Sequence, residues 1–137
     1  MTKEEKELLL KDLSARLPYG VKFLRESWNY EWNQELSVIE VLEDIDKDGY
    51  INNTKVYTIE DIKPYLRTMS SMTEEEYNEY RNIDNRSYTC PIDYAHIPAS
   101  DRIDWLLKNH FDYRELIPKG LAIEVTEENN LYNLDLL

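Results

Sequence analysis

The chain has 137 residues and 42% of them are hydrophobic, which is enough apolar mass for one domain that folds without metals or disulfides. Its formal net charge is -12, so it repels phosphate backbones and anionic lipid, and we expect no direct binding to nucleic acid or to a membrane. Cys90 is the single cysteine, the start MTKEEKELLL has acidic residues where a signal peptide needs basic ones, and no apolar run approaches the roughly 20 residues that span a bilayer, so we predict a cytoplasmic protein.

The first predicted element is a helix over residues 3 to 17. Thr2 and Glu5 have the spacing of a capping box, in which each side chain accepts a hydrogen bond from the other residue's backbone amide. Leucines then recur at helical spacing, and Pro18 ends the run. These leucines are Leu9, Leu10, Leu13 and Leu17.

Alternating apolar residues predict strands in the segments that follow. Residues 20 to 28 have the period of a first strand. Residues 36 to 45 fit either a helix or a strand, and their β-branched content together with the Asp48-Gly49 turn favours a strand. Further short strands are expected at residues 50–51 and 56–59.

Proline and capping signals organise the middle of the chain. Residues 60 to 66 are predicted to form one tight helical turn that closes around Pro64, where the chain reverses. A helix then begins after Thr73, because Thr73 and Glu76 form a second capping box whose acidic residues favour the positive end of the helix dipole. Residues 82 to 98 contain two prolines and no period, so they are expected to form a long loop.

The last predicted elements are a helix and a strand. Ser100 is expected to cap a helix that has apolar residues from Ile103 to Phe111 on one face. Gly120 is expected to adopt the left-handed conformation at the end of a turn, and residues 121 to 125 alternate as a strand. The predicted fold is therefore a single α+β domain over residues 1–137. It has an N-terminal helix, a small and mostly antiparallel curved sheet, and one or two C-terminal helices packed on that sheet.

Three segments carry a likeness to a known family: YGVK at residues 19–22, IEDIKPYLRTMSSMTEEEY at 59–77, and HFDYRELIPKGLAIE at 110–124. The chain resembles a family of small uncharacterised proteins from anaerobic gut bacteria that are often carried in prophages and conjugative elements, and its most specific motif is IKPYLRTMSSMTEEEY. The resemblance implies a mobile-element accessory protein of the host cytoplasm. No activity, cofactor or catalytic residue is established for that family, so it transfers no functional residue to this chain. Residues 82–98 and the tail LYNLDLL depart from the family pattern.

One acidic segment has the spacing of a metal site. Asp44, Asp46, Asp48 and Gly49 match the first half of a calcium-binding loop, D-x-D-x-D-G. The twelfth position of such a loop is normally a bidentate glutamate, and Lys55 stands there in this chain. A hairpin turn on Asp48-Gly49 explains the same letters, so the sequence favours the turn and leaves calcium binding as an alternative.

Two groups of residues are candidates for binding a partner. Trp28, Tyr30 and Trp32 lie at alternate positions, which puts them on one side of an extended segment, as a recognition surface or as a core-facing edge. Tyr77 and Tyr80 lie three apart on the acidic helix, as an interaction face or as a packing face. The acidic members of this second group are Glu74, Glu75 and Glu79.

The sequence contains no recognised catalytic motif, so we predict no catalytic residue and no cofactor. Two histidines and one cysteine are too few for a structural zinc site, and three separated glycines form no phosphate-binding loop. The main prediction is a non-enzymatic, acidic interaction module whose partner is a basic protein of the host or of the mobile element. The alternatives are a calcium-binding protein that uses residues 44–49, and a small hydrolase or transferase with an unrecognised acidic site. A deep pocket that contains carboxylates and the 82–98 loop is the expected sign of the enzyme.

Overall fold

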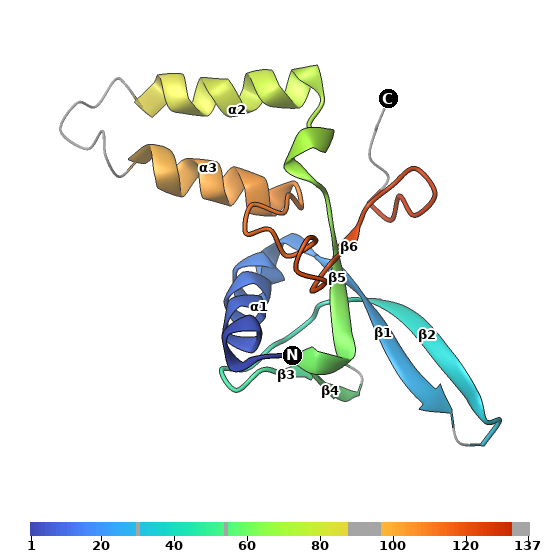
Figure 1. Ribbon diagram of the computed structural model, residues 1–137. Coiled ribbons are helices and arrows are strands. Elements are labelled where there is room, and N and C mark those ends of the chain that lie inside the picture. The colour runs from blue at the N-terminus through green and yellow to red at the C-terminus, as the bar shows by residue number, and fades with distance from the viewer. Residues whose placement is uncertain (30, 54, 88–96, 133–137) are drawn as a thin grey trace.

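The computed structural model describes residues 1–29, 31–53, 55–87 and 97–132, without the side chains of 26–29, 35, 36, 84–87 and 97–100. Three helices and six strands form in this part of the chain (Figure 1). The helices are α1 (Lys3–Arg16), α2 (Glu74–Ser87) and α3 (Ile97–Lys108), and the strands are β1 (Lys22–Asn29), β2 (Gln34–Val41), β3 (Tyr50–Asn52), β4 (Val56–Thr58), β5 (Ile62–Leu66) and β6 (Ile123–Glu124).

The strands form one four-stranded sheet in the order β2-β1-β5-β6 and one two-stranded hairpin, β3-β4. β1 pairs with β2 and with β5 in antiparallel fashion, and the short contact between β5 and β6 is parallel. α2 and α3 lie beside one another at one end of the molecule (Figure 1). The predicted α+β fold, with its N-terminal helix and mostly antiparallel strands, is therefore confirmed.

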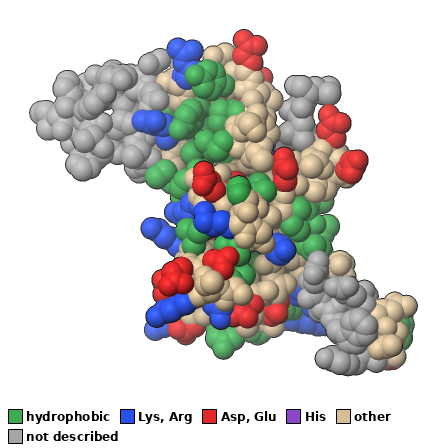
Figure 2. All heavy atoms as spheres, viewed as in Figure 1, with side chains coloured by type: hydrophobic (Ala, Val, Ile, Leu, Met, Phe, Trp, Pro, Cys, Tyr) green, Lys and Arg blue, Asp and Glu red, His purple; other side chains and the backbone are tan. Residues whose placement is uncertain are grey.

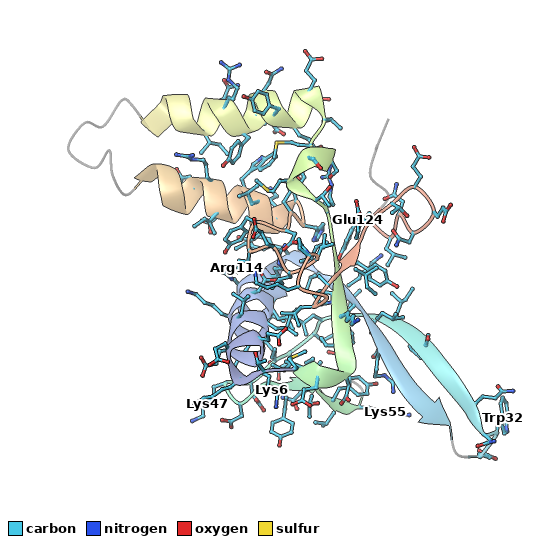
Figure 3. The ribbon with its side chains drawn as sticks, in the orientation of Figure 1. Lys6, Trp32, Lys47, Lys55, Arg114 and Glu124 are labelled. Atoms are coloured by element: carbon cyan, nitrogen blue, oxygen red, sulfur yellow. The ribbon has the colours of Figure 1, made fainter. Side chains whose placement is uncertain are left out.

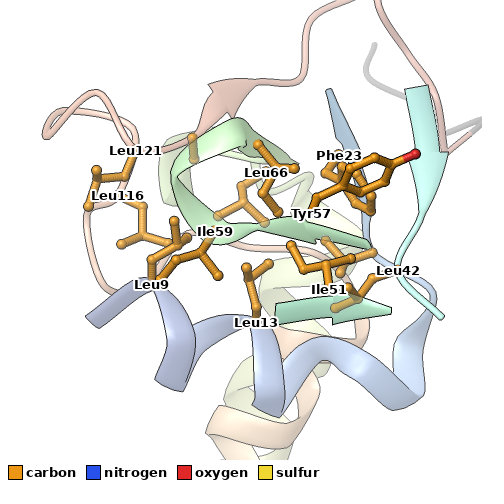
Figure 4. Close-up of a cluster of buried hydrophobic side chains, with 13 residues drawn as sticks. Leu9, Leu13, Phe23, Leu42, Ile51, Tyr57, Ile59, Leu66, Leu116 and Leu121 are labelled. Carbon is orange, nitrogen blue, oxygen red and sulfur yellow. The ribbon is translucent and has the colours of Figure 1, made fainter. Parts of the chain in front are cut away.

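The core lies where α1 meets the strands. Leu9 and Leu13 of α1 are fully buried and face Phe23 of β1 and Leu66 of β5 in one cluster (Figure 4). Each such side chain contributes about 1.5 to 3 kcal/mol when it leaves water, so the leucine spacing of α1 determines how the helix docks. The remaining buried members of the cluster are Val21, Leu42, Ile51, Tyr57, Ile59, Ile62, Leu116, Leu121 and Ala122.

Both capping boxes form as predicted. The Glu5 amide donates to Thr2 Oγ1 over 3.1 Å, and the Thr2 amide donates to Glu5 Oε1 over 3.0 Å. The same reciprocal pair joins Thr73 and Glu76, with distances of 3.1 Å and 3.0 Å. These bonds satisfy backbone donors that have no partner within a helix, so they fix where α1 and α2 begin.

The prediction of a helical turn around Pro64 is wrong, because residues 62–66 form strand β5 and the only helical turn there is short, at Ile59–Asp61. The β1 backbone explains why a proline fits. Leu42 N–H donates to Val21 O, so the backbone N–H and C=O groups of Val21 and of every second residue after it are directed toward β2. The backbone groups of Lys22 and Leu24 are directed toward β5. Pro64 is paired with Phe23 and so lies at a position where its missing N–H removes no bond to β1.

Three further boundaries differ from the sequence predictions. α2 continues to Ser87 and α3 already begins at Ile97, so residues 82–87 and 97–98 are helical and the loop prediction is wrong there, while 88–96 lie outside the described residues. Ser100 lies inside α3 and is not its cap. The helix already starts at Ile97, because a proline such as Pro98 is tolerated in the first helical turn. The helical alternative for residues 36–45 is wrong, because this segment supplies most of β2.

Candidate functional site

The β1–β2 hairpin extends well beyond the rest of the sheet (Figure 1). The two strands pair from Lys22↔Val41 to Asn29↔Gln34, whereas β5 pairs only with residues 23–25 of β1. We call this hairpin, residues 22–41, the arm. Trp32 is 68% exposed in the turn at its tip and points away from the body (Figure 3).

The predicted row of three aromatic residues on one side of a strand is wrong. β1 ends at Asn29 and the chain turns back over residues 31–33, where Asn33 has a φ of 52°. The period of two therefore stops before Trp32. Trp28 lies in β1 with an undescribed side chain, and Tyr30 lies outside the described residues.

β2 is an edge strand, and no strand among the described residues pairs with its outer side. In an antiparallel ladder, residues alternate between those that bond to the partner strand and those that face away. Since Leu42 bonds to Val21, the backbone groups of Ser37, Ile39 and Val41 face outward. The Val41 carbonyl is covered, because Asn53 Nδ2 donates to it over 2.8 Å.

The side chains of β2 also divide between two faces. Ile39 and Val41 are 47% and 43% exposed on one face. On the other face, Glu40 Oε2 lies 3.4 Å from Arg25 Nε, and the Arg25 guanidinium lies over the Tyr57 ring at 4.3 Å. One face of the arm thus presents aliphatic side chains to solvent, while the other is held by a charged and aromatic cluster.

The segment that contains β2 carries only negative charge. Residues 31–44 contain five carboxylates and no lysine or arginine. α1 instead balances its charges, and acidic and basic side chains lie together around it in Figure 2. The acidic excess that the composition reveals is therefore concentrated in three segments, which are residues 31–44, α2 and residues 124–128. The carboxylates of 31–44 are Glu31, Glu35, Glu40, Glu43 and Asp44.

α2 separates the two tyrosines that the sequence groups together. Tyr77 is 51% exposed on the outer face, whereas Tyr80 is turned toward α3, with its ring centroid 5.7 Å from that of Trp105. Tyr80 therefore packs, and only Tyr77 is on an outward face. Glu74, Glu75 and Glu79 are exposed, and this helix lies at the opposite end of the molecule from the tip of the arm (Figure 1).

The acidic loop at 44–49 forms the predicted turn. Asp46 Oδ1 accepts hydrogen bonds from the Asp48 and Tyr50 amides over 2.9 Å and 3.0 Å, and the bond from Tyr50 is the main reason that the pKa of Asp46 is below its ordinary value. Asp44 Oδ2 lies 3.4 Å from Asn52 Nδ2. Within the described residues, no group of three histidine, cysteine, aspartate or glutamate side chains is placed to hold a metal ion.

A pocket of about 350 Å³ lies between α1 and the β3–β4 hairpin. Its lining includes the carboxylates of Glu7, Asp48 and Glu60, and Lys6 forms an ion pair with Glu60. None of residues 82–98 is among its lining side chains in the described part of the chain. A hydrolase or transferase was expected to combine carboxylates with the 82–98 loop in one pocket. Among the described residues, this pocket has the carboxylates without that loop.

Sequence reasoning missed a buried ionic junction between β5, α2 and the segment after α3. Arg67 is 1% exposed, and its two terminal nitrogens each donate to one oxygen of Glu76 over 2.7 Å. Its guanidinium lies 4.2 Å from the centroid of the Phe111 ring. Glu76 was the available indication in the sequence, because the capping bond uses one oxygen of its carboxylate and leaves the other able to accept a hydrogen bond.

A second buried ion pair lies inside α1. Asp12 and Arg16 are both 0% exposed, and Arg16 Nε donates to Asp12 Oδ2 over 2.7 Å. Arg16 Nη2 also donates to the Phe111 carbonyl over 2.6 Å, which ties α1 to the segment after α3. The spacing of four residues between Asp12 and Arg16 was the available signal, although such pairs are usually at the surface.

The C-terminal segment is fixed at a half-buried histidine. His110 has a φ of 66°, and its ring stacks on that of Tyr132 with centroids 3.7 Å apart. The Tyr132 hydroxyl accepts from the Lys22 amide and donates to the Tyr65 carbonyl, each over 2.8 Å, so it bridges β1 and β5. Burial first, and then the nearby Arg16, Arg67 and Lys22 cations, lower the pKa of His110 to about 4.

This histidine predicts a specific pH dependence of stability. Between its unfolded pKa of 6.5 and its folded pKa of about 4, the unfolded chain binds a proton that the folded chain does not. The free energy of unfolding is therefore greatest above pH 6.5 and decreases as the pH is lowered. After allowance for partial solvent screening, we expect a loss of about 1 to 2 kcal/mol between about pH 7 and pH 5. Urea unfolding at both pH values measures it.

The control is His110→Asn, which tolerates the left-handed backbone and does not titrate. The difference in pH dependence between the two chains isolates the histidine from the carboxylates. Equal losses in both chains would show that His110 is not responsible.

Comparison with protein-family models, with curated proteins and with solved structures gives no match. The resemblance to a family carried by mobile elements therefore stays a prediction. Among the described residues, no helix has the length and apolar character needed to cross a membrane.

Proposed function

We propose that this protein is a non-enzymatic interaction module that binds a basic protein partner through the arm. The observation that carries the proposal is the position of β2, an acidic strand at the edge of the sheet with exposed Ile39 and Val41 on one face. Exposed aliphatic side chains beside an unpaired strand edge are features of surfaces that bind another chain. Trp32 at the tip adds a large amphipathic side chain of the kind that anchors interfaces.

Charge determines which partners the arm attracts. Five carboxylates and no cations in residues 31–44 favour encounter with a basic surface and oppose an acidic one. Because Glu31, Glu43 and Asp44 are exposed to solvent, the attraction weakens as salt is added. The proposed partner is a protein of the host or of the mobile element that the sequence resemblance implies, and the exposed acidic face of α2 is a secondary contact at most.

Affinity capture from a native host lysate tests this function with matched variants. Glu31→Gln/Glu43→Gln, the arm variant, removes one charge at the tip of the arm and one two residues past its end at Val41, and Glu75→Gln/Glu79→Gln removes two from α2. We expect a stoichiometric basic protein that is retained at low salt, released at high salt, and lost by the arm variant only. Two outcomes would contradict the proposal: no partner in either wash, or a partner lost by the α2 variant and kept by the arm variant.

A further inference from the structure

We infer that the partner supplies an extended basic segment that pairs with the outer edge of β2 as an additional strand of the sheet. This inference rests on the proposed function and specifies its binding mode. Strand addition uses main-chain hydrogen bonds for affinity and alternate side chains for specificity, and β2 offers both features at one edge.

The backbone of β2 defines where such a strand can lie. Ser37 and Ile39 each direct an N–H and a C=O away from β1, and no described strand pairs with them. At Val41 the edge is closed, because the Asn53 side chain donates to the Val41 carbonyl and accepts from the Glu43 amide over 3.0 Å. Asn53 thus occupies the position of the next strand residue and directs an incoming segment toward the tip of the arm.

The side chains of β2 define the sequence pattern of the segment. The residue opposite Ile39 gains from an apolar, β-branched side chain, because the Ile39 side chain is 47% exposed on the face that Val41 shares. The alternate positions of the segment face the side of the sheet that carries Glu40, whose carboxylate also lies 3.4 Å from Arg25 Nε. A segment with a β-branched residue opposite Ile39, and with basic residues toward Glu40 and toward the exposed Glu31 at the tip, therefore complements the edge.

The charge of β2 argues against a second copy of this chain as the occupant. Pairing of β2 with β2 would bring Glu35 and Glu40 of one strand beside the same two residues of another, with no lysine or arginine in either strand. Like charges across adjacent strands are destabilising. A basic segment removes this repulsion and replaces it with attraction.

Amide hydrogen exchange on the full chain tests the binding mode at low salt. The probe is a synthetic peptide of about eight residues, the usual length of a strand, in which lysine and valine alternate. We expect the peptide to slow exchange of the Ser37 and Ile39 amides by about tenfold or more, and to leave the Val38 and Glu40 amides unchanged because they already bond to β1. A peptide with glutamate in place of lysine should protect neither amide.

The variant Ile39→Pro removes an outward-facing N–H without removing a bond between β1 and β2. Ile39→Thr is the matched control, since it keeps the N–H and the β-branched shape. We expect about tenfold weaker peptide binding by Ile39→Pro than by Ile39→Thr. Unchanged protection of Val38 and Glu40 verifies that the proline variant keeps its hairpin.

Three outcomes would overturn the inference. They are equal peptide binding by the two variants, protection outside β2, and protection of Ser37 and Ile39 by self-association without peptide. If Ile39→Pro still captures the lysate partner and the arm charge variant does not, strand addition is wrong and the proposed function stands. If the arm charge variant keeps the partner, the proposed function itself fails.

Discussion

Replacing Arg67 by methionine is expected to lower the free energy of unfolding by about 3 to 5 kcal/mol. The guanidinium is 1% exposed, binds both oxygens of Glu76 and lies over Phe111, so its loss removes the bidentate bond that joins β5 to α2. It also leaves the Glu76 carboxylate partly buried with only the Thr73 cap as a partner. Urea denaturation followed by far-UV circular dichroism measures the change.

Glu75→Gln is the control for this prediction, because it removes a charge from the exposed side of the same helix and should change stability by less than about 0.5 kcal/mol. Burial acts to raise the pKa of Glu76, but its bonds to Arg67 and Thr73 hold that pKa below the ordinary value. The stability that this carboxylate contributes is therefore present above its unfolded pKa of 4.5 and is lost as pH falls through the folded value. If Arg67→Met were as stable as Glu75→Gln, the junction would not hold α2.

The second large effect is expected at the ion pair inside α1. Arg16→Met should cost about 3 to 5 kcal/mol, because Asp12 is 0% exposed and keeps only Arg114 Nη1, at 3.5 Å, as a charged neighbour. Asp12→Leu should cost a similar amount by leaving Arg16 buried and unpaired. The double variant should be more stable than the sum of the single changes predicts, by about 2 kcal/mol, because it leaves neither charge alone.

Lys11→Met is the matched control, since Lys11 is an exposed cation on the same helix and should be close to neutral. Thermal or urea unfolding of the four chains gives the coupling energy directly. Strict additivity of the two single changes would mean that Asp12 and Arg16 do not act as a pair.

The parts of the fold that were predicted correctly depend on local chemistry. The capping boxes at Thr2 and Thr73 involve residues three apart, so the sequence alone reveals them. The fit of Pro64 in a strand instead depends on the register of β1, which is set by the bond from Leu42 to Val21. A single segment carries no information about that register, and the sequence therefore favoured a turn.

The sequence predicted only part of the candidate site, because the rest depends on how distant segments are arranged. The acidity of residues 31–44 is visible in the composition, but the position of β2 at the edge of the sheet follows from the order of all four strands. Likewise, helical spacing groups Tyr77 with Tyr80, and only the contact with Trp105 decides that Tyr80 faces inward. In the sequence, Arg67 looks like an ordinary surface cation. Its contacts with Glu76 and Phe111 form only when the chain folds, so no local pattern reveals its burial.

The most direct test of the account is the salt dependence of affinity between the purified protein and the partner that it captures. We expect affinity to fall steeply with salt. Glu31→Gln/Glu43→Gln should lower both the affinity and the salt slope, while Glu75→Gln/Glu79→Gln should leave the slope nearly unchanged. Binding by the arm variant with the affinity and slope of the unaltered chain would contradict the claim that the arm is the binding element.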